Sequence, residues 1–134
     1  YYNRGFTYYN RFYPNLAIAD FTKAIELNPS GEFRIYPDNI SSVKVKGAAF
    51  NRRGLAYCKE DLYDQAISDQ AISDFTKAIE LNPQFAEAYC NRGCAYNAIG
   101  LKDKAESDFA KAREINPRYA DKNNSCEDGC RAYW

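Results

Sequence analysis

The sequence predicts an all-α protein, a superhelix of three helical hairpins. The main observation is a thirteen-residue phrase that occurs three times, as AIADFTKAIELNP at 17–29, AISDFTKAIELNP at 71–83 and AESDFAKAREINP at 105–117. A second observation is that Gly5 and Gly93 each precede the closing proline of their unit by 24 residues. Such constant offsets indicate one structural unit that is stacked repeatedly along the chain.

The first unit, residues 1–29, illustrates how the two helices of a hairpin are expected to form. Pro14 suits the first turn of the second helix, where its missing N–H would have no partner anyway. Asn28 and Pro29 end that helix, because Asn tolerates a left-handed cap and Pro cannot continue the helix. Small and aromatic residues at helical spacing form the predicted packing faces. They are Tyr1, Gly5 and Tyr8 in the first helix and Ala17, Phe21 and Ala24 in the second.

The third unit, 84–117, repeats this pattern, whereas the second unit, 48–83, contains five extra residues. They form a tandem copy of DQAIS, at 64–68 and again at 69–73. Five helical residues turn a helix face by roughly 500°, so the two copies cannot point at the same neighbours. The second copy runs directly into Phe75, so we expect it to pack. The first is then expected to lengthen the second helix at its N-terminal end, or to be absorbed in the turn after Leu62.

An insertion, 30–47, separates the first two units. The stretches 33–36 and 43–46 flank a turn-like sequence around Pro37, and their alternating, β-branched character predicts a short β-hairpin or an extended loop. Gly31 and Gly47 are candidate hinges at its ends. Two strands alone are only marginally stable, so we expect this arm to lean on a helix pair or on a second copy of the chain.

The last stretch, 118–134, differs from the start of a further unit, because Asn123 and Asn124 fall where apolar residues would be needed. Repeat arrays require a terminal element with a polar outer side. Cys126, Cys130 and Tyr133 follow helical spacing and predict a short capping helix, with a frayed tail as the alternative.

The composition narrows the functional classes. Lys plus Arg and Asp plus Glu both number 18 in 134 residues, so no strong field would attract nucleic acid or an anionic membrane. No apolar run reaches the length of a membrane span, and the absence of Met suggests a piece of a longer chain. The sequence has no His and no Gly-rich phosphate loop, which removes His-dependent catalysis and most zinc ligand sets. We therefore expect no enzyme activity, no catalytic residue, no metal and no cofactor.

Five cysteines, an odd number, occur in a chain that has a core without them. We predict reduced thiols in a cytoplasmic protein rather than a disulfide framework. Cys58, Cys90 and Cys94 would lie on the same side of neighbouring helices, where three thiols could bind a soft metal or form a redox pair. Cys is also a common small residue on packed helices, and a structural role is the favoured interpretation.

Gly, Tyr, Ala, Phe, Ala and Pro at these offsets resemble the tetratricopeptide repeat family, a helix-turn-helix unit of about 34 residues. The resemblance covers most of the chain, as one domain spanning 1–134. One departure is that an Arg precedes each glycine where the family usually has Leu. An Asp precedes the second-helix Phe in every unit, so we predict ion pairs across each hairpin, with separate exposed charges as the alternative. The predicted pairs are Arg4–Asp20, Arg53–Asp74 and Arg92–Asp108.

The resemblance implies a concave groove, lined by the first helix of each repeat, that holds an extended peptide or a partner helix. The residues one step beyond the packing faces are Tyr2, Phe6, Tyr9, Asn51, Leu55, Cys58, Cys90, Cys94 and Asn97. Family members that bind chaperones clamp a partner's C-terminal carboxylate with Lys, Asn and Arg. Tyr2, Phe6 and Leu55 are among the residues that stand at such places here, so we expect no carboxylate clamp.

Two functions from different classes follow. The first is a non-catalytic scaffold that binds a protein or peptide in the groove. The second is a structural self-association module, a homodimer formed through the 30–47 arm or the lengthened second helix. In that second case, or if a further repeat precedes this chain, Tyr2, Phe6 and Tyr9 would be covered rather than available to a partner.

Overall fold

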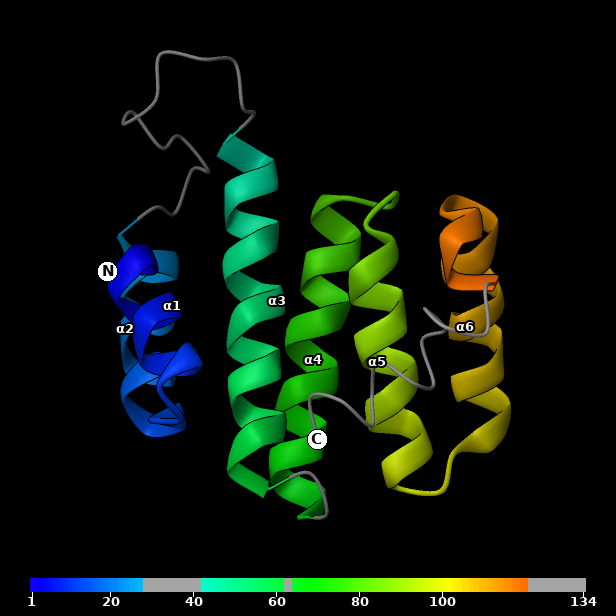
Figure 1. Ribbon diagram of the computed structural model, residues 1–134, viewed down its shortest axis with the longest axis horizontal. Coiled ribbons are helices and arrows are strands. Elements are labelled where there is room, and N and C mark those ends of the chain that lie inside the picture. Colours follow the sequence, from blue (N-terminus) through cyan, green and yellow to red (C-terminus); the bar gives the residue numbers. More distant parts are fainter. Residues whose placement is uncertain (28–41, 62–63, 121–134) are drawn as a thin grey trace.

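The computed structural model describes residues 1–27, 42–61 and 64–120, with side chains over 46–60 in the second range. The helices are α1 (Tyr2–Asn10), α2 (Pro14–Glu26), α3 (Ser42–Asp61), α4 (Gln65–Leu81), α5 (Ala86–Ala98), α6 (Lys102–Ile115) and the 3₁₀ helix η1 (Pro117–Ala120). These described ranges contain no β-strand, so the predicted all-α class is confirmed. Figure 1 shows the pairs α1/α2, α3/α4 and α5/α6 side by side in chain order.

Each hairpin is held by close contact between a glycine and a phenylalanine. A Cβ atom added to Gly93 would lie 2.5 Å from Cε1 of Phe109, and one added to Gly54 would lie 2.6 Å from Cε1 of Phe75. No side chain fits at these places, which explains why Gly interrupts otherwise helical sequences. The predicted packing of small residues against one large ring is therefore confirmed.

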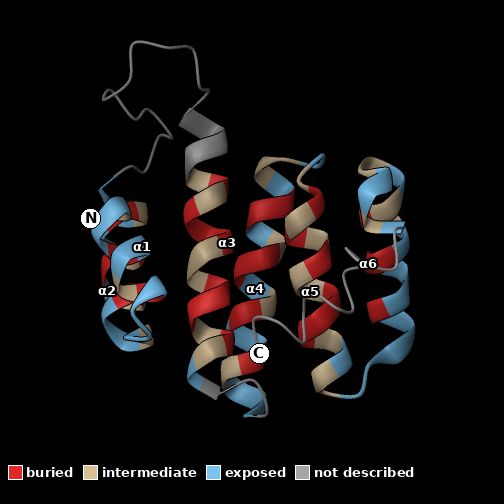
Figure 2. Ribbon diagram, viewed as in Figure 1, coloured by how far each residue is buried: buried red, intermediate tan, exposed pale blue. Residues whose placement is uncertain are grey.

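The second helix of one hairpin packs on the first helix of the next, through contacts of α2 with α3 and of α4 with α5. Figure 2 shows the resulting burial, with buried positions on the sides of the helices that face their neighbours. Phe21 and Phe75 both belong to one buried cluster that joins the first two hairpins, whereas Phe109 lies in a second cluster within the third. The core is thus distributed along the stack in separate clusters rather than gathered at one centre, as expected for repeat proteins.

The predicted helix boundaries hold where the structure describes them. Pro14 is the first residue of α2. α4 ends at Leu81, directly before Asn82 and Pro83, and α6 ends at Ile115, directly before Asn116 and Pro117. The corresponding Asn28 and Pro29 lie outside the described residues.

The five extra residues of the second unit lengthen both helices of its hairpin. α3 extends seven residues beyond its glycine where α1 and α5 extend five, and α4 begins ten residues before its Phe where α2 and α6 begin seven. All three hairpin connections (11–13, 62–64 and 99–101) therefore keep the same length of three residues. The five extra residues add two to α3 and three to α4, so the middle hairpin is longer while its turn is not.

The second copy packs and the first lengthens α4, as predicted. Ala71 of the second copy is fully buried, whereas its counterpart Ala66 is exposed. Asp64 of the first copy caps the helix, since its side chain accepts a hydrogen bond of 3.0 Å from the backbone N–H of Ile67. Ser68 of the first copy is also fully buried, which the sequence did not predict.

The β-hairpin predicted for the insertion is wrong over its second half. α3 begins at Ser42, so 43–46 is helical rather than extended. Gly47 is not a hinge either, because it is buried inside α3 and an added Cβ would lie 3.5 Å from the carbonyl oxygen of Ala78. The β-branched residues of this stretch therefore lie in a helix, since β propensity is a weak and context-dependent preference. The remainder of the insertion, with Gly31, lies outside the described residues.

The chain continues past α6 into η1, whose Tyr119 packs against the buried cluster of the third hairpin. The predicted capping helix, with Cys126, Cys130 and Tyr133, lies outside the described residues and stays a prediction. Among the helices that the structure describes, none is both long and apolar enough to cross a membrane.

Candidate functional site

The three predicted Arg–Asp pairs all form, and each is bidentate. Nε and Nη2 of Arg53 donate to Asp74 at 2.7 and 2.8 Å, and Arg92 and Asp108 pair at the same two distances. Arg4 reaches Asp20 at 2.6 and 2.7 Å. Two parallel hydrogen bonds between charged groups make a directional brace across each hairpin.

Two of these arginines also join neighbouring hairpins, which the sequence analysis missed. Nη1 of Arg53 donates to the hydroxyl of Thr22 at 3.0 Å, and Nη1 of Arg92 donates to the hydroxyl of Thr76 at 3.1 Å. The signal was present, because both Thr follow the second-helix Phe directly, as in DFTKA. Arg4 lies in the first hairpin, and its side chain is 59% exposed.

The residues predicted to line a groove belong to α1, α3 and α5, and the side on which these helices neighbour one another is called the α1–α3–α5 face here. These predicted groove residues differ strongly in how far their side chains are buried. Phe6 and Asn97 are exposed, and Tyr2 is partly buried with its ring centroid 5.7 Å from that of Phe21. The buried members are Tyr9, Asn51, Leu55, Cys58, Cys90 and Cys94.

The buried members do not form one surface. Tyr9, Leu55 and Cys58 lie together in the cluster that joins the first two hairpins, and Cys90 and Cys94 lie in the cluster of the third. Asn51 is 1% exposed, and its amide makes hydrogen bonds to α5 instead. These side chains offer a ligand little surface, so any contact falls mainly to their less buried neighbours.

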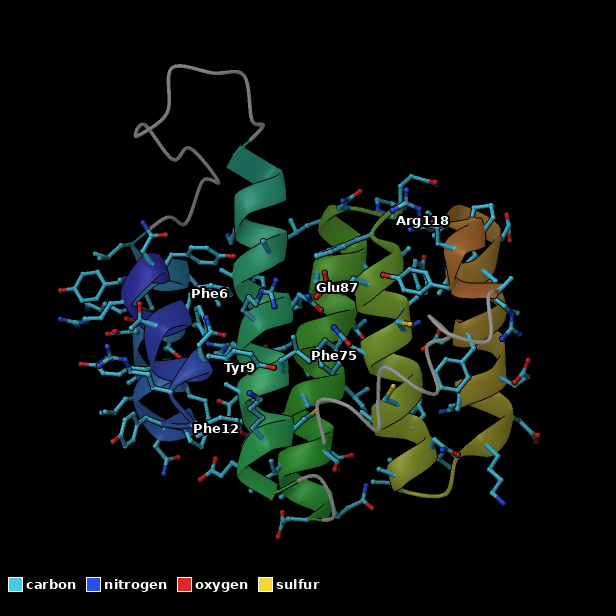
Figure 3. All side chains as sticks on the ribbon, in the orientation of Figure 1. Phe6, Tyr9, Phe12, Phe75, Glu87 and Arg118 are labelled. Atoms are coloured by element: carbon cyan, nitrogen blue, oxygen red, sulfur yellow. The ribbon has the colours of Figure 1, made fainter. Side chains whose placement is uncertain are left out.

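Those neighbours form a row that crosses all three helices. The guanidinium of Arg52 in α3 lies 5.3 Å from the ring centroid of Phe6 in α1 and its Nη1 lies 3.9 Å from Oε1 of Glu87 in α5. Asn51 donates to the same Oε1 at 3.2 Å, and Asn91 donates to Oδ1 of Asn51 at 2.9 Å. Figure 3 shows Phe6 and Glu87 at similar height on opposite sides of α3.

Sequence reasoning found Phe6 and Asn51 of this row but missed Arg52, Glu87 and Asn91. Arg52 lies between two predicted positions, and Glu87 and Asn91 lie one turn apart on α5, so a wider helical stripe would have included them. With side chains 30% and 40% exposed, Arg52 and Glu87 are accessible and carry opposite charges. The row can therefore offer an aromatic surface, a cation and an anion to one ligand.

A second group of side chains surrounds Lys59. Its Nζ lies 3.8 Å from the ring centroid of Tyr9 and 4.6 Å from that of Phe12. Burial lowers the pKa of this ammonium. Phe12 is 77% exposed and has a φ of 61°, in the left-handed region that bulky residues avoid. The equivalent position of the third hairpin is Gly100, with a φ of 83°.

The expectation of reduced thiols is wrong for two cysteines. Cys90 and Cys94 are both disulfide-bonded, whereas Cys58 is a buried free thiol whose pKa is raised by burial. An unreactive, protonated thiol agrees with the predicted structural role of Cys58. Within the described residues, no cluster of three or more His, Cys, Asp or Glu side chains is arranged to hold a metal ion.

Stacked hairpins with a Gly–Phe contact and an Arg–Asp brace in each define a helical repeat protein. Comparison with known families gives the same result, because the tetratricopeptide repeat matches residues 1–30 and 86–119, and a second description of the same repeat matches 54–100. The chain belongs to the tetratricopeptide repeat family. Repeats of this family are generally protein–protein interaction modules. A search of curated proteins found no match.

Proposed function

We propose that this protein is a non-catalytic scaffold that binds an extended peptide or a partner helix across the α1–α3–α5 face. The observation that carries the proposal is the row from Phe6 through Arg52 to Glu87, which spans three helices with accessible side chains. A ligand lying across the helices would meet all three groups in succession. Asn97, exposed on α5, extends the same face.

The chemistry of the row indicates the kind of partner. Phe6 offers an aromatic contact, and aromatic and Arg side chains are typical anchors of protein interfaces. Arg52 and Glu87 already pair at 3.9 Å, a loose contact that a partner's carboxylate or ammonium can replace. A segment with one apolar side chain flanked by charged or amide side chains fits this arrangement.

A peptide-array screen with the purified chain tests the proposal. Peptides that bind the wild type are expected to lose most of their signal with Phe6→Ala and with Arg52→Ala. Leu16→Ala is the matched control, because Leu16 is an exposed apolar residue on α2, outside the face. Binding that is insensitive to both face substitutions, or equally sensitive to Leu16→Ala, would remove the basis of the proposal.

Self-association is the competing function. In the first copy of DQAIS, which lengthens α4, Asp64, Gln65 and Ala66 are exposed and offer a second copy of the chain little apolar surface to bury. This observation favours the scaffold. Mass measurement in solution, on the full chain and on a variant lacking 30–41, separates the two functions. If both samples are monomers, the homodimer is excluded. If the full chain is a dimer and the variant lacking 30–41 is a monomer, self-association is supported.

A further inference from the structure

The first helix of every hairpin carries a stripe of three residues, called the arginine stripe here. It consists of an aromatic residue four positions before the glycine, an arginine directly before it and a tyrosine three positions after it. In each stripe Cζ of the arginine lies over the first ring, 5.3 Å from the ring centroid at α1, 5.5 Å in α3 and 5.7 Å in α5. The stripes are Tyr1, Arg4 and Tyr8, then Phe50, Arg53 and Tyr57, then Tyr89, Arg92 and Tyr96.

In α3 and α5 the arginine stripe lies against a complementary stripe of the second helix before it. This threonine stripe has isoleucine, threonine and isoleucine at positions i, i+4 and i+7. Its threonine hydroxyl accepts a hydrogen bond from Nη1 of the facing arginine, at 3.0 Å in one interface and 3.1 Å in the other. Ile25 packs against the buried cluster that contains Phe50, and Ile79 belongs to the cluster against which Tyr89 packs. The threonine stripes are Ile18, Thr22 and Ile25 in α2 and Ile72, Thr76 and Ile79 in α4.

The arginine stripe of α1 has the same groups but lies at the surface. The Arg4 side chain is 59% exposed, against 15% for Arg53 and 17% for Arg92. Nε and Nη2 of Arg4 donate to Asp20, as in the other two braces. Nη1 of Arg4, the atom that reaches threonine in the other stripes, has no acceptor within residues 1–27, 42–61 and 64–120.

α6 does not carry a threonine stripe. The equivalent positions are Glu106, Ala110 and Arg113, and Nη2 of Arg113 lies 2.6 Å from Oε1 of Glu106. Charged side chains thus replace both isoleucines and pair with each other, and alanine replaces the hydroxyl. This α6 stripe has nothing to offer an arginine stripe.

The threonines of the chain are already assigned. The sequence contains three, of which Thr22 and Thr76 accept hydrogen bonds from the arginines of α3 and α5, and Thr7 lies in α1 itself. A second copy of the chain has the same three threonines in the same contacts. The complement of the α1 stripe is therefore a partner helix rather than a helix of this chain or of its copy.

We infer that the arginine stripe of α1 binds a partner helix with an aliphatic residue, a threonine and an aliphatic residue at positions i, i+4 and i+7. The threonine hydroxyl accepts a hydrogen bond from Nη1 of Arg4, and the aliphatic side chains cover the rings of Tyr1 and Tyr8. The stripe thereby continues the interface that joins α2 to α3 and α4 to α5. The inference uses none of the groups of the peptide-binding row, so it does not depend on the proposed function.

A hairpin joined to the full chain tests the inference, because a single helix of this length is only marginally stable in water. A copy of 48–88 placed directly before Tyr1 presents the α4 stripe to α1 through the connection that joins α4 to α5. A copy of 82–122, which has equal length and the same register, presents the α6 stripe and is the matched control.

Hydrogen exchange of the α1 backbone amides is the readout. Exchange is expected to be about tenfold slower or more with the 48–88 copy than with the 82–122 copy, because only the first covers α1 with a complementary stripe. Circular dichroism checks that both added hairpins are helical. Equal exchange in the two extended chains overturns the inference.

The substitution Thr76→Val in the added copy tests the hydrogen bond to Arg4. It should lower the urea midpoint of the extended chain about as much as Thr22→Val lowers that of the unextended chain, since each removes one arginine–threonine contact. When Arg4→Lys is also present, Thr76→Val in the added copy should have less effect, because lysine keeps a cation beside Asp20 but lacks the guanidinium fork. An equal effect with and without Arg4→Lys contradicts recognition of the hydroxyl.

The unextended chain distinguishes a partner helix from a second copy. Hydrogen exchange of its α1 amides is expected to be independent of protein concentration. Exchange that slows as the concentration rises would show that a second copy covers the arginine stripe of α1, which overturns the inference.

Discussion

Asp20 shows how a single charged pair links the fold to pH. Its carboxylate accepts two hydrogen bonds from Arg4, and these bonds lower the pKa of Asp20 below its ordinary value of 3.8. A carboxylate with a lowered pKa stabilises the folded state fully above its unfolded pKa, and the contribution is lost as the pH falls through the folded value. The brace of the first hairpin is therefore expected to weaken only in acid.

We predict that the free energy of unfolding of the wild type falls more between pH 6 and pH 2 than that of Asp20→Asn. The asparagine variant is less stable at pH 6 but has no charge to lose. Urea titrations at several pH values, followed by circular dichroism, measure both slopes. When Arg4 is already replaced by Leu, Asp20→Asn should change the pH dependence of the free energy of unfolding less than it does in the wild type. Equal slopes in wild type and Asp20→Asn would contradict a role for this pair.

At the scale of the helical hairpin, the contact between glycine and phenylalanine sets how closely two helices approach. A Cβ on Gly93 would lie 2.5 Å from Phe109 and 3.2 Å from the carbonyl oxygen of Ala105. The phenylalanine ring is buried and the carbonyl belongs to the helix backbone, so neither can move freely. An added methyl group has to separate α5 from α6.

We predict that Gly93→Ala lowers the free energy of unfolding by about 2–3 kcal/mol, within the range found for overpacked cores. Gly100→Ala is a matched control with a different cause. Nothing lies within 4 Å of its Cβ position, but its φ of 83° is unfavourable for alanine, at about 1 kcal/mol. Denaturant titrations of both variants measure the difference. A larger loss for Gly100→Ala would show that helix spacing is not the limiting feature.

The duplicated segment gives a second test at this scale. Because the two DQAIS copies are identical, deleting either produces the same protein, with α3 and α4 expected at the lengths of the other hairpins. We predict an unchanged helical fold and a free energy of unfolding within about 1 kcal/mol of the wild type, because Ala71 and Phe75 keep their packing. Circular dichroism and urea titration measure this. Loss of cooperative unfolding would show that the longer helices are required.

At the scale of the whole molecule, the arginine–threonine contacts add a polar link between the second helix of one hairpin and the first helix of the next. Arg53 holds Asp74 of its own hairpin and Thr22 of the preceding one, and Arg92 does the same with Asp108 and Thr76. In a repeat array the stability of each unit and the coupling between units contribute separately. The arginine–threonine contacts contribute to the coupling between neighbouring hairpins.

We predict that Thr22→Val and Thr76→Val each lower the free energy of unfolding by about 1 kcal/mol, and that the double variant unfolds over a broader denaturant range. Thr7→Val is the control, because the hydroxyl of Thr7 bonds only to the carbonyl oxygen of Asn3 within α1. Transitions followed by tyrosine fluorescence and by circular dichroism should separate in the double variant. Coincident, equally steep transitions would contradict this coupling.

The sequence by itself determined the helical hairpins, their boundaries and the braces within them. Gly93 and Phe109, or Arg92 and Asp108, are separated by the same 16 residues, and a hairpin with a fixed connection turns such an offset into a contact. The same reasoning from residue spacing identified the second copy of DQAIS as the one that packs against neighbouring helices. The prediction for 43–46 was wrong, because these β-branched residues lie in α3 and local β propensity is only a weak preference.

Only the tertiary structure decided which side chains on the α1–α3–α5 face remain accessible. Tyr9 and Asn51 were predicted to meet a ligand, yet neighbouring hairpins bury both and leave Phe6 and Arg52 at the surface. The spacing of residues along the sequence also did not predict that Cys90 and Cys94 are disulfide-bonded. The physical reason is the same in each case: a helical period fixes the direction of a side chain relative to its own helix, but burial, pairing and bonding depend on distant parts of the chain.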